Sequence, residues 1–135
     1  MPRHQFQPGF RFSALDVLVL IGSAIGAGAA LALVPWVGFV IAFVVAHFFL
    51  FCNIFRIARA LELAWAALFV LLAAGTVVID FPGWTITAGI SLAATVVVVV
   101  VEMRKPSYHG VFWQRINPGL RLWWEQNVAK VESEA

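Results

Sequence analysis

Charged side chains are scarce in this sequence. Asp, Glu, Lys and Arg together account for 12% of the 135 residues, whereas hydrophobic residues account for 62%. A soluble domain is about one quarter charged and about half apolar. A chain of this length also has too little interior to bury such an excess of apolar surface. We therefore expect lipid to surround much of the protein.

Cysteine is nearly absent as well, because Cys52 is the only one. A single cysteine excludes an intrachain disulfide and any metal site built from several cysteines. Neither the ligand spacings of a zinc site nor the serine, histidine and carboxylate of a hydrolytic triad can be found. A haem held by two histidines would need a second copy of His47 from a symmetric dimer, because His4 and His109 lie outside the apolar segments. We predict no enzymatic activity, no metal site and no cofactor.

Long uncharged segments are what the sequence has instead. The first runs from Val17 to Phe55, and it is long enough for two helical spans because one span needs about 20 apolar residues. Pro35 disfavours a helical conformation in the residue before it, so we place the fold-back there. Pro82 and Gly83 are turn residues that separate two further apolar segments. The predicted spans are residues 13–33, 36–55, 61–79 and 84–101.

The spans must be α-helices, because an open strand edge leaves backbone groups without partners in hydrocarbon. The predicted fold class is an all-α integral membrane protein with four transmembrane helices in two antiparallel hairpins. Residues 13–103 form this domain, residues 1–12 precede it, and residues 104–135 form a tail. One alternative is a signal peptide cleaved after Ala30-Leu31-Ala32. We favour a retained span because the next apolar segment begins immediately afterwards.

Positive charges occur only before the first span, between the second and third spans, and after the fourth. The other two loops have none. Short loops rich in Lys and Arg stay in the cytoplasm, so we predict that both termini are cytoplasmic. Because no organellar targeting segment is visible, the expected location is the bacterial inner membrane. The residues concerned are Arg3, Arg11, Arg56, Arg59, Arg104, Lys105, Arg115, Arg121 and Lys130.

Small residues on the first and fourth spans indicate where helices pack. Helices in lipid associate through close approach of their backbones, which small side chains allow. Gly22 and Gly26 form a small-xxx-small pair in the first span, and Gly89 and Ala93 form one in the fourth. Large aliphatic side chains on the opposite face of the first span suit contact with acyl chains.

The tail is expected to contain an amphipathic helix at residues 118–132. Asn117 and Pro118 suit an N-cap and a first helical position, and an apolar stripe at helical spacing follows. This pattern indicates a helix lying on the cytoplasmic leaflet, or a docking surface for a partner subunit. Glutamates among the basic residues of the tail argue against nucleic-acid binding. The candidate anchoring or docking residues are Trp36, Trp113, Trp123, Trp124 and Arg121.

Asp16 and His47 are the candidate intramembrane polar pair. An ionisable group inside a span is costly and is by default a functional hypothesis. A carboxylate partner would tune a histidine that titrates near physiological pH, so the pair, with Asn53 as a third member, could relay protons or bind a cation. The alternative, which we favour, is a neutral His47 bonded to a neighbouring helix, with Asp16 meeting water or Arg11 near the surface.

The few polar groups in the bilayer, the glycine-lined helices and the aromatic tail together favour a structural role. The predicted function is a non-catalytic structural or accessory subunit of a larger membrane assembly. Its predicted partners are the lipid bilayer and either other membrane subunits or further copies of the chain. The alternative is a small homo-oligomeric transporter or channel that uses Asp16 and His47 to handle protons or a cation.

The charge distribution leads to a test of topology. Trp36 lies between the first two spans and Arg56 lies between the second and third, so the two positions should face opposite compartments. In a Cys52→Ser background, the variants Trp36→Cys and Arg56→Cys should react with a membrane-impermeant thiol reagent from opposite sides. Labelling of both positions from the same side would contradict the predicted topology.

Overall fold

Four long helices make up most of the protein, and no strand occurs within residues 5–134, which this computed structural model describes. The helices are α1 (Ala14–Leu33), α2 (Pro35–Phe49), α3 (Arg59–Ile79) and α4 (Trp84–Met103), and a π-helical turn, η1 (Leu50–Ile54), continues α2. All four helical segments are long and apolar enough to cross a membrane. The prediction of an all-helical protein with four such helices is confirmed.

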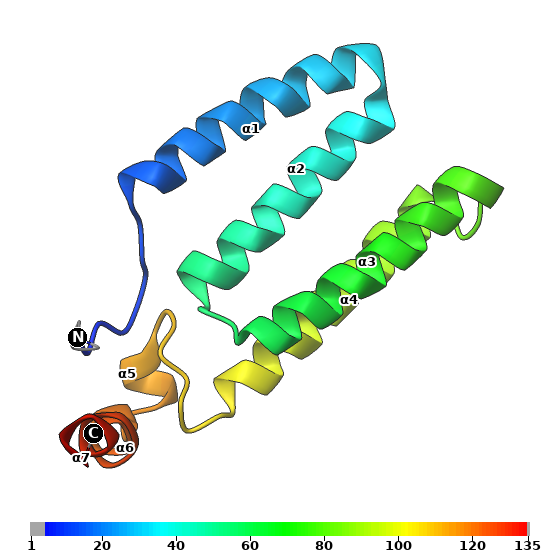
Figure 1. Ribbon diagram of the computed structural model, residues 1–135. Helices are drawn as coiled ribbons and strands as arrows, with labels where there is room; N and C mark the ends of the chain where they lie inside the picture. The colour runs from blue at the N-terminus through cyan, green and yellow to red at the C-terminus, as the bar shows by residue number, and fades with distance from the viewer. Residues whose placement is uncertain (1–4, 135) are drawn as a thin grey trace.

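Consecutive long helices run in opposite directions and lie next to one another (Figure 1). α2 returns alongside α1, α3 lies beside α2, and α4 lies alongside α3. The short connections at Val34 and at residues 80–83 lie at one end of the bundle. The segment before α1, the link between η1 and α3, and the tail after α4 lie at the other end, which we call the tail end.

Local sequence explains where the long helices begin and end. The hydroxyl of Ser13 accepts a hydrogen bond from the backbone N–H of Asp16, and this bond caps α1. Pro35 occupies the first turn of α2, where its missing N–H is no loss. Asp80 ends α3 in the left-handed conformation, with a φ of 54°, which a short polar side chain tolerates.

Gly38 lets α2 approach the end of α1 closely. A Cβ atom at this position would lie 2.5 Å from the backbone nitrogen of Leu31 and 2.7 Å from the carbonyl oxygen of Ala27. Ala27 is also the only residue of α1 that is buried. A side chain at position 38 would therefore push the two helices apart where they pack.

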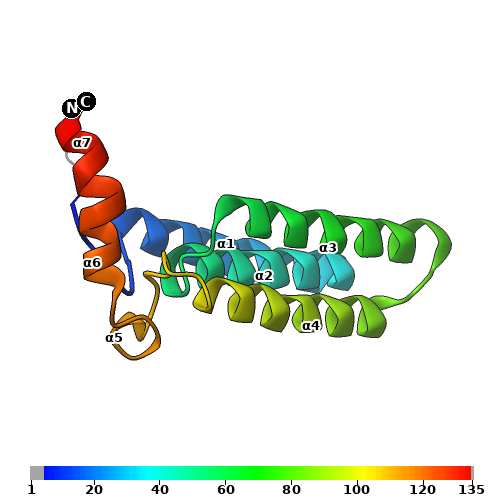
Figure 2. The same ribbon diagram turned by 90° about the horizontal axis from the view of Figure 1, so that it is seen from below.

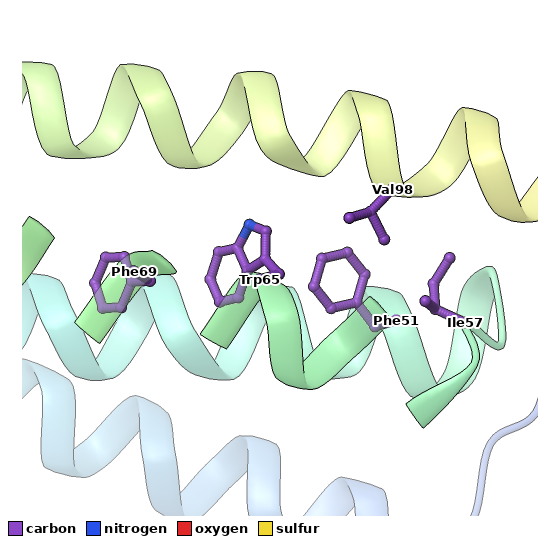
Figure 3. Packing of buried hydrophobic residues seen from close by; sticks show 5 residues of the cluster. All are labelled: Phe51, Ile57, Trp65, Phe69 and Val98. Atoms are coloured by element: carbon purple, nitrogen blue, oxygen red, sulfur yellow. The ribbon is translucent and has the colours of Figure 1, made fainter. Parts of the chain in front are cut away.

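The buried core lies between α2, α3 and α4. Phe51 of η1 is completely buried and Trp65 of α3 is 2% exposed, and Phe69, Val98 and Ile57 pack with them (Figure 3). Lipid tails are as apolar as these side chains, so their packing stabilises the bundle through van der Waals contact and not through removal from water.

Most apolar side chains point outwards. Within the most apolar part of each span, 6% of the residues are buried in α1 and 22% in each of the other three. Leu33, Leu71 and Val78 are 82%, 73% and 78% exposed. Soluble monomers rarely expose apolar patches of such extent. These faces therefore contact lipid, and the chain is a multi-pass membrane protein.

Two segments that are far apart in the sequence close the tail end of the bundle. The backbone N–H of Arg11 donates to the carbonyl of Asn53 at 3.0 Å, and that of Val111 donates to the carbonyl of Ile54 at 2.8 Å. These bonds satisfy carbonyl groups at the helix end that lack a partner within the helix. The N–H of Gly9 donates to the carbonyl of His109 at 2.7 Å and so joins the two segments.

Tyr108 anchors the loop that follows α4. Its side chain is completely buried, and its hydroxyl donates to the carbonyl of Val111 at 2.7 Å. Burial, with a smaller contribution from the Glu102 carboxylate, raises the pKa of Tyr108 to about 12. The phenol therefore stays protonated and keeps this hydrogen bond well above neutral pH.

The tail ends in a helical rod that lies across the tail end of the bundle (Figure 2). A short helix, α5 (Trp113–Ile116), precedes the rod, which consists of α6 (Leu120–Trp124), η2 (Glu125–Ala129) and α7 (Lys130–Glu134). Leu120 is completely buried, whereas Leu122 and Val131 are 65% and 61% exposed. The rod thus keeps apolar side chains on its outer surface.

The sequence-based assignment of Asn117 as a helix N-cap is wrong. The N-cap of α6 is Gly119. The side-chain amide of Asn117 donates instead to the carbonyls of Pro106 and Tyr108, at 2.7 Å and 3.1 Å. These carbonyls lie in the loop after α4, and the local pattern around Asn117 contains no sign of that contact.

Gly38 and Gly28 offer a matched pair of substitutions. Gly38→Ala should lower the free energy of unfolding by about 1–3 kcal/mol, the usual cost of overpacking. Gly28→Ala should instead raise it by up to about 1 kcal/mol, because alanine suits a helix interior better than glycine and no atom outside the adjoining helix backbone lies within 4 Å of the position of its Cβ. Thermal unfolding in mild detergent, followed by circular dichroism, compares them. Equal stability of the two variants would rule out a close approach at Gly38.

Candidate functional site

His47 is buried among aromatic rings, with 7% of its surface exposed. Its imidazole stacks on Trp65 with the ring centroids 4.5 Å apart, and the ring of Phe43 lies 4.3 Å away. Nδ1 lies 2.7 Å from the carbonyl oxygen of Phe43, one turn earlier in α2. Because a carbonyl only accepts, Nδ1 is the donor in this hydrogen bond.

Asp16 takes part in the start of α1. Its Oδ2 atom accepts hydrogen bonds from the backbone N–H and from the hydroxyl of Ser13, both at 2.7 Å. Together with the bond from the Asp16 N–H back to the Ser13 hydroxyl at 3.3 Å, these contacts form a capping box. The three-residue spacing of Ser13 and Asp16 is the sequence signal that predicts this structural role.

The structure does not bring Asp16 and His47 together. Within residues 5–134, the hydrogen bonds of the Asp16 carboxylate are with Ser13, whereas the contacts of His47 are with aromatic rings and the carbonyl of Phe43. Asn53 is buried, with 6% exposed, and it lines the same cavity as Asp16. One member of the pair thus lies beside a cavity and the other lies in the aromatic core.

That cavity lies between α1 and α2 and has a volume of about 330 Å³. The two helices diverge from the turn at Val34 toward the tail end (Figure 1), and the cavity lies where they are apart. Its lining is apolar except for Asp16 and Asn53, and it includes Cys52. Val19 also lines it and is 53% exposed, so the cavity is open to acyl chains of the bilayer.

Glu62 is buried at the start of α3, with 7% of its surface exposed. Nε of Arg59 lies 3.9 Å from its Oε2 atom, and the thiol of Cys52 donates to its Oε1 atom at 3.5 Å. A carboxylate in the first turn also interacts favourably with the positive end of the helix dipole. These contacts give Glu62 a structural role in joining η1 to α3.

A row of hydroxyl side chains on α4 faces α3. Thr87, Ser91 and Thr95 are buried and follow one another at intervals of one helical turn. The Nε1–H of Trp65 donates to the hydroxyl of Thr95 at 2.9 Å and to the carbonyl of Ser91 at 3.0 Å. The hydroxyls of Thr76 and Thr87 lie 2.9 Å apart. Such hydrogen bonds join helices in lipid, and the regular spacing of the hydroxyl residues is the signal that predicts this face.

The small residues that the sequence assigns to helix packing do not contact another helix of this chain. Apart from the adjoining backbone of the same helix, no heavy atom lies within 4 Å of the position that a Cβ would take at Gly22, Gly26 or Gly89, and Ala93 is exposed. α1 meets α2 through the side that carries Ala27, and α4 meets α3 through the hydroxyl row. The glycine faces of α1 and α4 are therefore open.

The candidate anchoring residues divide between the two ends of the bundle. Trp36 stacks on Trp84 beside the short connections, with ring centroids 5.9 Å apart. At the tail end, the ring of Phe6 packs edge-on against Trp113 and Trp124, at 5.8 Å and 5.5 Å. Both ends therefore carry aromatic residues, as is typical of membrane–water interfaces.

The two remaining anchoring candidates lie on α6. Trp123 is half-buried. Arg121 is exposed, and its Nε lies 3.8 Å from Oε1 of Glu125, one turn later. An exposed pair of this kind contributes only a few tenths of a kcal/mol, so Arg121 is accessible to lipid headgroups or to a partner.

No group of three His, Cys, Asp or Glu side chains is placed to hold a metal ion in the part of the chain that the structure describes. Comparisons with protein-family models, with curated proteins and with solved structures find no match to this chain.

A double-mutant cycle tests the separation of Asp16 and His47. His47→Gln removes an aromatic stack and Asp16→Asn weakens a helix cap, so each should lower the free energy of unfolding. Because the two side chains share no contact, the two effects should add to within about 0.5 kcal/mol. Unfolding of the two single variants and the double variant in mild detergent measures the coupling. A coupling energy above about 1 kcal/mol would mean that the two side chains interact.

Proposed function

We propose that this protein is a non-catalytic accessory subunit that packs against other subunits within a membrane assembly. The open glycine faces are the observation that carries the proposal. Gly22 and Gly26 lie on one face of α1 and Gly89 lies on α4, with no neighbouring atom near the positions of their Cβ atoms. Small residues in lipid allow helices to approach closely, so a helix of another subunit fits these faces.

The limited burial of α1 supports the same conclusion. This helix buries only Ala27, and it packs closely against α2 alone. A second helix packed on the opposite side of α1 would make closer van der Waals contacts with it than lipid tails do. Within residues 5–134, α1 therefore has no second closely packed helix, and a partner subunit would supply one.

The ionisable residues Asp16, His47 and Glu62 each have a structural partner, which favours a structural role over transport. The carboxylate of Asp16 caps α1, the imidazole of His47 is stacked in the core, and Glu62 is paired with Arg59. A proton or cation pathway needs polar groups that face one another along a route. Asp16 and His47, the residues that the transporter alternative would use, share no hydrogen bond within residues 5–134.

The proposed orientation has the tail end in the cytoplasm of a bacterial cell, with the protein in the inner membrane. The segments that gather at the tail end (Figure 1) carry the cationic residues, and the opposite end has none among the described residues. Short segments rich in Lys and Arg stay in the cytoplasm. The cations at the tail end are Arg11, Arg56, Arg59, Arg104, Lys105, Arg115, Arg121 and Lys130.

Gly26→Leu and Gly28→Leu provide a matched test of the accessory role. The two positions lie about 200° apart around the helix axis, and both have open space at their Cβ positions, so neither change should unfold the chain. The tagged protein, extracted from its native membrane in gentle detergent, should bring a partner subunit with it. Gly26→Leu should remove most of that partner, whereas Gly28→Leu should retain it.

Native mass spectrometry of these preparations identifies the partner and its copy number. Recovery of the unmodified protein as a monodisperse monomer, with no second subunit, would overturn the proposal. Equal loss of the partner in both variants would mean that the glycine face of α1 is not the contact.

A further inference from the structure

A small cavity lies at the tail end of the bundle, beside the segment that precedes α1. Its volume is about 50 Å³. Its lining comes from three parts of the chain: the segment before α1, the link after η1, and the tail. The residues that define its character are Gln5, Phe6, Gln7, Arg56, His109 and Trp124.

The backbone directs Arg56 toward this cavity. Arg56 follows the end of η1 and has a φ of 49°, a left-handed conformation that non-glycine residues rarely adopt. Its side chain is half-buried, and Nη1 donates to the carbonyl of Gln7 in the segment before α1. The guanidinium group thus lies against that segment and is only partly removed from solvent.

Among the side chains that the structure describes, none supplies a carboxylate that compensates the charge of Arg56. No carboxylate of the described residues lies within 4 Å of its guanidinium group, and none lines the cavity. Burial lowers the pKa of the Arg56 guanidinium, and the positive charge of Arg11 lowers it further. An arginine nevertheless stays charged at physiological pH. A partly desolvated cation beside a second cation is unfavourable, and a bound anion would offset that cost.

The other walls combine one further polar donor with a histidine ring and an apolar surface. The Nε2–H group of Gln7 donates to Oε1 of Gln5 at 2.9 Å, which leaves the amide nitrogen of Gln5 as a further donor. The ring of His109 is oriented by a hydrogen bond between its Nδ1 and the carbonyl of Ser107 at 2.9 Å. Trp124, packed edge-on against Phe6, closes the cavity with an apolar wall.

The size of the cavity limits what it can hold. One water-sized group needs about 10–15 Å³ of cavity volume, so roughly three to five groups of this size fit. The three free oxygens of a phosphate monoester, or the two of a diester, fit this space, and a nucleoside or sugar does not. Arginine binds such oxygens through a planar fork of N–H donors.

We propose that this cavity binds a phosphate group through the guanidinium of Arg56. Two sources offer that chemistry at this place: the headgroup of an anionic phospholipid, and a soluble phosphate. Arg56 comes directly after a membrane-spanning helix, at the level where headgroups lie, and basic residues next to a span attract anionic lipid.

Calorimetric titration of the purified full-length protein in gentle detergent tests the site. The probes are short-chain phosphatidylglycerol, short-chain phosphatidylcholine and inorganic phosphate. For whichever of these probes binds the unmodified protein, Arg56→Gln should raise the dissociation constant about tenfold, because a charge-assisted hydrogen bond is lost. Arg115→Gln removes the same charge from an exposed position at the same end and should weaken binding less than twofold.

The three probes separate the two sources of phosphate. Binding of phosphatidylglycerol in preference to phosphatidylcholine, without competition from inorganic phosphate, assigns the site to anionic lipid; binding of inorganic phosphate assigns it to a soluble ligand. Arg56→Lys, which keeps the charge and loses the planar fork, should weaken binding about threefold and serves if Arg56→Gln does not fold. Absence of binding by every probe, or equal weakening by the Arg56 and Arg115 variants, would overturn the proposal.

Discussion

Trp65 joins three of the four long helices, and the arrangement of the bundle depends on it. Its ring stacks on His47 of α2 and on Phe69 of its own helix, while its Nε1–H donates to Ser91 and Thr95 of α4. In lipid, apolar faces are solvated as well by acyl chains as by other helices, so close packing and hydrogen bonds decide which faces meet. The indole supplies both. The helix that it does not reach, α1, is also the helix that buries least within the chain.

The tail end of the bundle owes its structure to a different set of contacts. Backbone hydrogen bonds from Arg11 and Val111 satisfy the end of η1, and the ring of Phe6 packs between Trp113 and Trp124. This end also gathers the cationic residues, three of which pair with glutamates of the same end. The proposed phosphate site and the proposed accessory role involve different parts of the protein and are independent of each other. The first concerns the headgroup level at the tail end, and the second concerns the glycine faces within the bilayer.

The sequence predicted the helical fold well and the contacts of single polar residues poorly. Length and apolar composition locate four helices, because a span needs a minimum number of apolar residues whatever its neighbours are. The pairing of Asp16 with His47 was a weaker inference, since it required knowledge of which helix faces meet. Ser13, three residues before Asp16, contained the better signal. Asn117 was assigned a local role as a helix cap, but its partners are carbonyls at Pro106 and Tyr108.

The sequence by itself determined that the chain is helical, that it has four segments able to cross a membrane, and where the turns between them lie. These properties follow from local composition and from the need to satisfy every backbone group in hydrocarbon. Only the tertiary structure decided that His47 stacks on Trp65, that the hydroxyl row of α4 faces α3, and that the glycine pair of α1 stays open. Those outcomes depend on side chains distant in sequence, and an apolar helix in lipid has no strong amphipathic pattern to reveal which of its faces will be covered.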